Sequence, residues 1–303
     1  MYIAFYYGNM IFMNIFLQLL INSLIAGAIY SLIACGFSLI YSTNKFIHFA
    51  HGGVIIFSSY IFYTLFSLLH FEFYLSCILT VIFAGLFGYS INLIIYTPLR
   101  KKKASSLILL VAGLGVLILT ESLSLIFWGA DVKTINYIDN IQGLSIFGAI
   151  ITPLQLIIII FSLVFLIFFY LLMKKTRLGK AMRAVSDNAN VAEIVGISTT
   201  KIYSKAFIIG SIVAGVASIL ISLEQNIEST LGTSLMIKGF TAAVIGGLGS
   251  VPGAILGAYF LGLTENFGIW YLPSGYKDAI AFILLFLFLL FRPNGILGIK
   301  YNS

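Results

Sequence analysis

Residues 152–173 read TPLQLIIIIFSLVFLIFFYLLM, an apolar run without a single charged side chain. A helix needs about 20 such residues to cross the hydrocarbon core of a bilayer. Inside lipid, only helices and closed barrels satisfy their backbone hydrogen bonds, and barrel strands read instead as alternating segments of about ten residues. The run therefore predicts a transmembrane helix.

The whole chain has the composition of a membrane protein. Of its 303 residues, 60% are hydrophobic and 9% are charged, whereas charged residues make up about 25% of a typical soluble domain. We expect an all-α, polytopic transmembrane helical bundle that forms one domain over residues 1–303. Eight hydrophobic segments are predicted, at residues 12–42, 46–70, 74–97, 104–128, 152–173, 205–223, 240–266 and 278–292.

The formal charge of +7 comes from Lys and Arg residues that gather at the ends of the apolar runs. This arrangement favours the positive-inside pattern of a membrane protein over nucleic-acid binding. The clusters at residues 100–103 and in the loop 174–204 place both loops in the cytoplasm and the N-terminus outside. Arg292 places the C-terminus in the cytoplasm as well, so the number of full crossings must be odd.

Eight single crossings would give an even number. The glycine-rich part of segment 240–266 is the place where that segment is expected to divide into two short half-helices that enter and return, which makes the number of full crossings odd. Broken helices are tolerated at membrane depth where protein or a cavity covers the freed backbone. Two interpretations are open: close helix packing through small residues, and an unwound backbone that contacts a zwitterionic solute. The residues concerned are Gly246, Gly247, Gly249, Pro252 and Gly253.

The chain lacks the motifs of the common enzymes. Gly179-Lys180 has neither the upstream glycine nor the following Ser or Thr of a nucleotide-binding loop. There is also no paired-His zinc motif and no Gly-x-Ser-x-Gly elbow. We expect a protein that is not an enzyme and binds no metal or cofactor itself.

The basic loop after the fifth segment is predicted to be a short helical hairpin. Asp187 or Asn188 is placed to cap a helix that ends at Gly196. The small residues Ala189, Ala192 and Val195 or Gly196 lie at spacings of three to four residues, so they offer a face on which another protein can approach closely. An ordinary solvated loop helix is the other interpretation.

Three ionisable side chains within or beside the apolar segments are further candidates. His48 and His51 lie near the inner end of the second segment, either as a proton relay or as packed side chains that bond to nearby backbone. Glu121 is the one acid clearly inside a predicted span, which makes it a functional candidate. If the fourth segment ends earlier, Glu121 lies instead in the outer interface.

Four motifs occur in the order found in one family. They read NSLIAGAIYSL at residues 22–32, FAHG at 49–52, GKAMRA at 179–184 with Gly196-Ile197 after it, and AAVIGGLGSVPGA at 242–254. Together they make nearly the whole chain resemble the permeases of the branched-chain amino acid ABC importer family, specifically the shorter of the two permease subunits. His48 departs from the Asn that family members usually carry, so the substrate preference does not transfer residue by residue.

The resemblance implies a set of partners in the bacterial cytoplasmic (inner) membrane. Two cytoplasmic ABC ATPase subunits would bind the ATP, a second permease of a different chain would complete the pore, and an extracytoplasmic substrate-binding protein would deliver branched-chain amino acids. The ATPase-coupling residues would be Gly179, Arg183, Ala184, Ala189, Ala192, Glu193 and Gly196. The translocation path would include His51, Gly52, Glu121, Gly246, Gly247, Gly249 and Gly253.

Three other functions stay open from the sequence. An ABC permease for urea or short amides would share the same architecture. A proton-coupled secondary transporter would use Glu121 and the histidines, and would favour an inverted repeat. A structural membrane protein would explain the glycines but not the basic hairpin.

Overall fold

The computed structural model describes residues 2–135, 137, 143–146 and 148–298, so the two chain ends, Met1 and residues 299–303, lie outside it. A two-stranded antiparallel sheet joins β1 (Leu144–Ile146) to β2 (Ala149–Ile151). The helices are α1 (Tyr2–Asn44), α2 (Ala50–Tyr63), α3 (Phe73–Ile91), α4 (Thr97–Lys101), α5 (Ser106–Trp128), α6 (Pro153–Lys175), α7 (Arg177–Asp187), α8 (Ala189–Ile194), α9 (Thr199–Glu224), α10 (Leu231–Gly246), α11 (Val251–Gly268) and α12 (Lys277–Phe291). Short π-helical turns, Thr64–Leu68 and Asn92–Tyr96, continue α2 and α3, and a 3₁₀ turn, Ser274–Tyr276, precedes α12.

Within the described residues, seven helices are long and apolar enough to span a bilayer, and one further pair, α10 and α11, is bent by 116° at a short break. This confirms the predicted helical bundle with one broken segment. The seventh segment begins at Leu231 rather than at residue 240. Lys238 and two nearby glycines lower the hydropathy averaged over this stretch. The sequence pattern therefore does not include the first half of α10 in the apolar segment.

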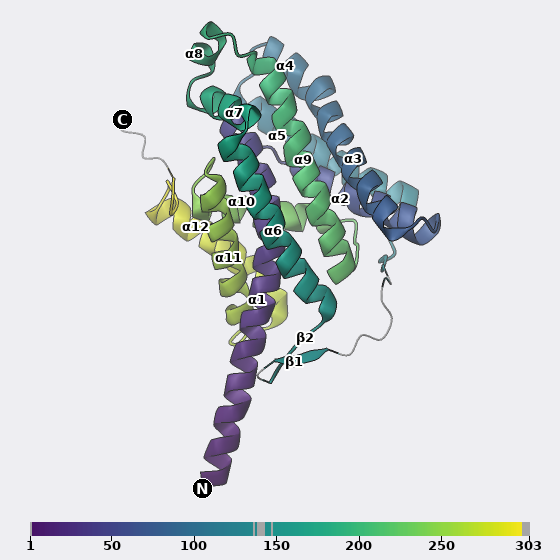
Figure 1. Ribbon diagram of the computed structural model, residues 1–303, viewed down its shortest axis with the longest axis vertical. Coiled ribbons are helices and arrows are strands. Elements are labelled where there is room, and N and C mark those ends of the chain that lie inside the picture. Colours follow the sequence, from purple (N-terminus) through teal and green to yellow (C-terminus); the bar gives the residue numbers. More distant parts are fainter. Residues whose placement is uncertain (1, 136, 138–142, 147, 299–303) are drawn as a thin grey trace.

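The ends of the bundle differ in charge. Figure 1 shows α4, α7 and α8 together at one end, with the N-terminus at the other. We call the end formed by α4, residues 101–103, α7 and α8 the basic end. The β1–β2 hairpin lies away from it, where the Gln18 side chain accepts from the Ile150 amide at 2.8 Å and donates to the Ile150 carbonyl at 3.0 Å.

The core forms around two helices. The apolar stretches of α1 and α9 are largely buried, and α1 packs along α11, α9 and α10. The flanking helices α3, α5, α6 and α12 expose most of their apolar surface. In a soluble protein such a surface would be a liability, but lipid is as apolar as these side chains, so the bilayer covers it.

The break between α10 and α11 lies where the glycines predict it. Gly247 and Gly249 adopt positive φ angles of 109° and 86°, a backbone region that glycine enters at little cost. Breaking a helix leaves carbonyls without partners. The segment after α12 supplies them: the Ile296 amide donates to the Ile245 carbonyl at 2.8 Å, and the Leu297 amide to the Gly246 carbonyl at 2.9 Å.

The two halves of the broken pair touch through their backbones. A Cβ placed on Gly246 would lie 1.9 Å from the Gly253 carbonyl oxygen, and one on Gly257 would lie 2.1 Å from the Ala242 carbonyl oxygen. Real Cβ atoms do not approach a backbone oxygen so closely. These contacts support the packing interpretation of the glycines.

The Gly246→Ala substitution is therefore expected to destabilise the protein by about 1–3 kcal/mol, the usual cost of overpacking a tight contact. Gly115→Ala in α5 is the matched control, because its Cβ would meet nothing within 4 Å. Thermal unfolding of the detergent-purified variants measures the difference. Equal midpoints for the two variants would contradict the close approach of α10 and α11.

Candidate functional site

The hairpin at the basic end is built by two capped helices. The Thr176 hydroxyl accepts from the Gly179 amide at 3.1 Å and begins α7. Of the two expected capping residues for α8, Asn188 caps it: its side-chain oxygen accepts from the Val191 amide at 3.1 Å. Gly196, at φ +85°, follows α8, and its amide bonds to the Glu193 carbonyl at 2.9 Å.

The hairpin turns only part of the expected face outward. Ala192 is 2% exposed and packs into the core, so it is not at the surface, and Gly179 is buried as well. The outward side consists of Val191 and Ile194 in α8 and Val195 directly after it, which are 53%, 83% and 69% exposed. Their spacing of three and four residues in a polar loop is the sequence signal that indicates this apolar tip.

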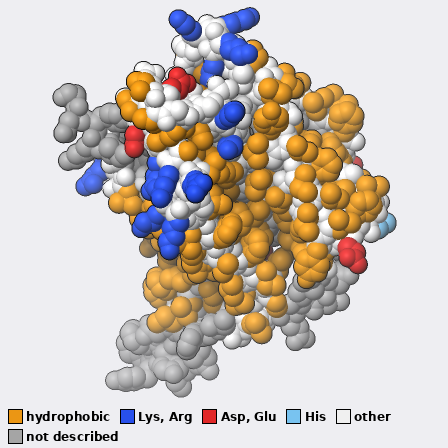
Figure 2. Space-filling view, turned by 45° about the horizontal axis from the view of Figure 1, so that its top comes forward, with side chains coloured by type: hydrophobic (Ala, Val, Ile, Leu, Met, Phe, Trp, Pro, Cys, Tyr) orange, Lys and Arg blue, Asp and Glu red, His pale blue; other side chains and the backbone are white. Residues whose placement is uncertain are grey.

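The remaining residues named for the hairpin hold it together. The Glu193 carboxylate accepts a hydrogen bond from the Thr199 hydroxyl and ties α8 to α9. An Arg183 guanidinium nitrogen donates to the Lys174 carbonyl at 3.2 Å and ties α7 to α6. Ala184 and Ala189 are half-buried against the bundle. Figure 2 shows Lys and Arg side chains gathered around this end, beside an apolar flank.

Glu121 joins α5 to the first turn of α10. Its carboxylate accepts from the Thr233 amide at 3.0 Å and from the Thr233 hydroxyl at 2.7 Å. No side chain at Thr230, the residue before α10, caps that helix, so Glu121 replaces the missing cap. Since α5 continues to Trp128, Glu121 lies within the helix, and it is partly buried at the joint with α10.

The two histidines lie in the interior, at the entry to α2. His48 and His51 are both fully buried, and the His48 Nδ1 is 2.9 Å from the Tyr96 hydroxyl. A Cβ on Gly36 would meet the His51 ring at 3.0 Å. Gly52 lets α2 approach α10 closely, because its Cβ would lie 2.6 Å from the Gly232 carbonyl oxygen. These surroundings favour packed histidines over a proton relay.

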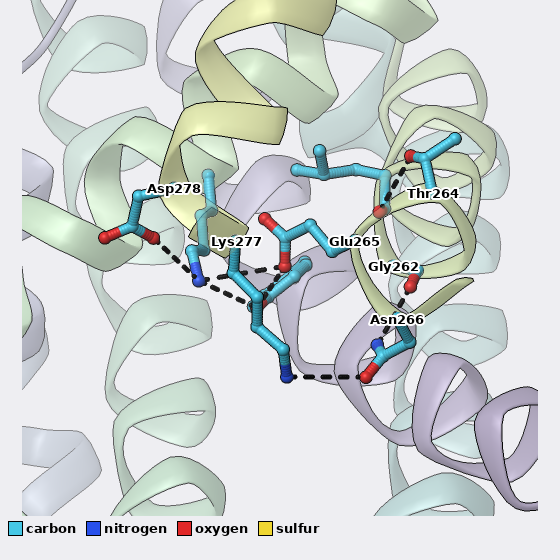
Figure 3. Close-up of polar contacts among 9 residues, drawn as sticks. Gly262, Thr264, Glu265, Asn266, Lys277 and Asp278 are labelled. Atoms are coloured by element: carbon cyan, nitrogen blue, oxygen red, sulfur yellow. Dashed lines mark hydrogen bonds and ion pairs between the residues drawn. The ribbon is translucent and has the colours of Figure 1, made fainter. Parts of the chain in front are cut away.

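Sequence reasoning missed a buried ionic cluster, and naming Glu121 as the one acid inside a span was wrong. Glu265 in α11 is 0% exposed. The Lys238 ammonium is 3.7 Å from the Glu265 carboxylate and 3.2 Å from that of Asp278, and it donates to the Tyr30 hydroxyl at 3.2 Å. Tyr30 in turn donates to Glu265 at 2.9 Å. Figure 3 shows the neighbouring Lys277 side chain reaching toward Asn266, to whose side-chain oxygen it donates at 3.4 Å.

This cluster joins four helices, α1, α10, α11 and α12, near the end of α11 and the start of α12. Burying charges is costly unless each is paired and hydrogen-bonded. Lys238 meets that condition with two carboxylates and one hydroxyl. Among the described residues, no group of three or more His, Cys, Asp or Glu side chains could hold a metal ion.

The geometry defines a class: a multi-pass helical membrane protein with one broken span and a structured hairpin at its basic end. A family model described as the permease component of branched-chain amino acid transport systems matches residues 19–289. The chain belongs to this family of transporter permeases, which are not enzymes. None of the solved structures compared with the chain matches it.

Individual relatives match along almost the full length. The chain is 36% identical over 300 residues to the high-affinity branched-chain amino acid transport system permease protein BraD of Pseudomonas aeruginosa, covering 93% of this chain and 96% of the relative. It is 32% identical over 296 residues to the corresponding protein LivH of Escherichia coli K12, with the same coverage. A probable LivH of Methanocaldococcus jannaschii is 33% identical over 292 residues, 90% of this chain and 89% of the relative.

Proposed function

We propose that this chain is the shorter permease subunit of an ABC importer and forms part of the transmembrane path for branched-chain amino acids. The family match over residues 19–289 carries the proposal. Relatives named as components of a transport system imply partner subunits. These are two ABC ATPases, a second permease of a different chain and an external substrate-binding protein.

The basic end faces the cytoplasm in this proposal. Lys101 is the last residue of α4, Lys102 and Lys103 follow it directly, and α7 adds further basic residues at the same end. Lys and Arg are retained on the cytoplasmic side of short membrane loops. The N-terminus then lies outside and the chain end after α12 lies in the cytoplasm of a bacterial cell, in its cytoplasmic membrane.

The apolar tip of α8 is the proposed ATPase contact. Val191, Ile194 and Val195 are exposed, and α8 lies at the basic end of the bundle (Figure 1). Exposed apolar patches rimmed by polar residues mark protein interaction sites. Movement of the ATPase would pass through α7, which packs on the ends of α6, α1 and α9.

The translocation path runs along the joint of α5 and α10 in this proposal. Glu121 and Thr233 lie there, and a polar cavity formed by Glu228, Thr230 and Ser234 opens beside the start of α10. Paired carboxylate and hydroxyl groups are suited to a zwitterionic amino acid. The second permease chain covers this face, and the binding protein delivers its substrate at the end opposite α8.

Uptake of radiolabelled leucine tests the function directly. Cells that lack this gene are compared with cells that express it again, at equal membrane levels of the partner proteins. We expect uptake to return with the gene, with competition by isoleucine and valine but not by urea or acetamide. Competition by urea or acetamide alone would favour the alternative substrate class.

Glu121→Ala is expected to lower the initial rate of leucine uptake about tenfold, because the charged acceptor for Thr233 is lost and such a hydrogen bond contributes about 1.5–3 kcal/mol. Glu121→Gln keeps an accepting oxygen and should retain an intermediate rate. Ser122→Ala, at an exposed neighbouring position, is the control and should transport normally. If Glu121→Ala takes up leucine at the wild-type rate, the joint of α5 and α10 is not part of the translocation path.

A further inference from the structure

A cavity opens at the basic end, between the hairpin and the break in the α10–α11 pair. Its volume is about 280 Å³. The ends of α1 and α6 form one side, α7 forms another, and residues 249–252 of the break close it. The apolar tip of α8, the proposed ATPase contact, does not line this cavity, whereas Arg183 from the expected coupling residues does.

The cavity carries positive charge without a counter-charge. Lys174 and Arg183 line it, no acidic residue does, and neither cation forms an ion pair within 4 Å among the described residues. Lys174 contacts the Tyr170 hydroxyl at 3.2 Å, and Arg183 donates to a backbone carbonyl. Both keep further N–H groups to donate, since an ammonium has three donors and a guanidinium five.

Hydroxyl groups line the same space. Ser250 accepts from the Gly253 amide at 3.2 Å, which leaves its O–H group available as a donor. Ser186 on α7 also lines the cavity, and no hydrogen bond occupies its side chain among the described residues. Two cations and two hydroxyl donors together make a site for a phosphate-bearing anion.

The position of the cavity along α6 fits the headgroup layer of a bilayer. Lys174 follows the apolar run 152–173 directly, and Tyr170 lies one turn before it, as aromatic residues do at membrane interfaces. Met173 and Met182 give the cavity an apolar wall. Basic pockets between transmembrane helices on the cytoplasmic side bind anionic lipid headgroups.

We propose that this cavity binds the phosphate group of an anionic phospholipid from the leaflet at the basic end. Lys174 and Arg183 hold the phosphate oxygens, Ser186 and Ser250 donate to them, and the methionines contact the glycerol and first acyl carbons. One bound headgroup then joins the hairpin helix α7 to the break between α10 and α11. Lipid composition would thereby influence how the hairpin and the broken pair move together.

Native mass spectrometry of the detergent-purified chain tests the site. The probes are phosphatidylglycerol, phosphatidylcholine and inorganic phosphate. The double variant Lys174→Gln/Arg183→Gln is compared with Arg177→Gln/Lys180→Gln, which removes the same charge from α7 residues that do not line the cavity. Size-exclusion profiles and unfolding midpoints confirm that both variants are folded.

We expect wild type and the Arg177/Lys180 control to retain phosphatidylglycerol, and the Lys174/Arg183 variant to retain about tenfold less, because charge-assisted hydrogen bonds to the phosphate are lost. Phosphatidylcholine should bind weakly to all three. Displacement of the lipid by inorganic phosphate would assign the site to the phosphate group itself. Equal loss in both double variants, or retention in both, would overturn the proposal.

Discussion

Replacing Ile194 by aspartate is expected to remove the ATPase subunits from the purified transporter and to abolish leucine uptake. Ile194 is 83% exposed at the end of α8 and is the most exposed member of the apolar tip. A central apolar contact at an interface contributes about 2 kcal/mol or more, and a buried, unpaired carboxylate adds a further cost. The expected loss of affinity is therefore at least about 30-fold.

The neighbouring substitution Asn190→Asp is the matched control, because it adds the same charge at an exposed polar position of α8. It should retain the ATPases. The amount of ATPase per permease in affinity-purified membranes measures both variants, and the unfolding midpoint of each shows whether the bundle is intact. Normal ATPase content in a folded Ile194→Asp protein would place the contact elsewhere on the basic end.

Lys238→Met is expected to cost about 3–5 kcal/mol of stability, because removing one partner of a buried ion pair leaves an uncompensated charge. Among the described residues, Glu265 would keep only the Tyr30 hydroxyl as its hydrogen-bond donor. The double variant Lys238→Met/Glu265→Gln removes both charges and should recover more than half of the loss. Unfolding of the detergent-purified proteins, followed by intrinsic fluorescence, gives the comparison.

A surface ion pair offers the control for this cluster. Lys133 lies 3.8 Å from Asp131, whose side chain is 93% exposed, and exposed pairs contribute about 1 kcal/mol or less. Lys133→Met should therefore change stability little. A double Lys238/Glu265 variant no more stable than Lys238→Met would show that the charges do not stabilise each other.

Local composition explains why so much of the fold was predictable. The spans are apolar runs of the length that a bilayer requires. The break at residues 246–250 is indicated by the glycines clustered within an otherwise apolar run. The Asn188 cap and the Gly196 stop of α8 are likewise local signals, and the structure has both.

What the sequence could not reveal depends on contacts between distant residues. Lys238 looks like the edge of a loop until Glu265 and Asp278 are brought beside it by the return of α11 and α12. Ala192 looks like an exposed small residue until α8 is seen folded onto α9. Packing onto α9 decides which side of this six-residue helix faces inward, whereas the spacing of Val191, Ile194 and Val195 is the local signal for its outward side.

The most direct test of the account is affinity purification of the tagged chain from its own membrane, followed by mass spectrometry. We predict that two ABC ATPase subunits and a second, different permease co-purify with it in fixed proportion. If the chain is recovered intact and folded without any ATPase, the proposal of an ATP-driven importer subunit is contradicted.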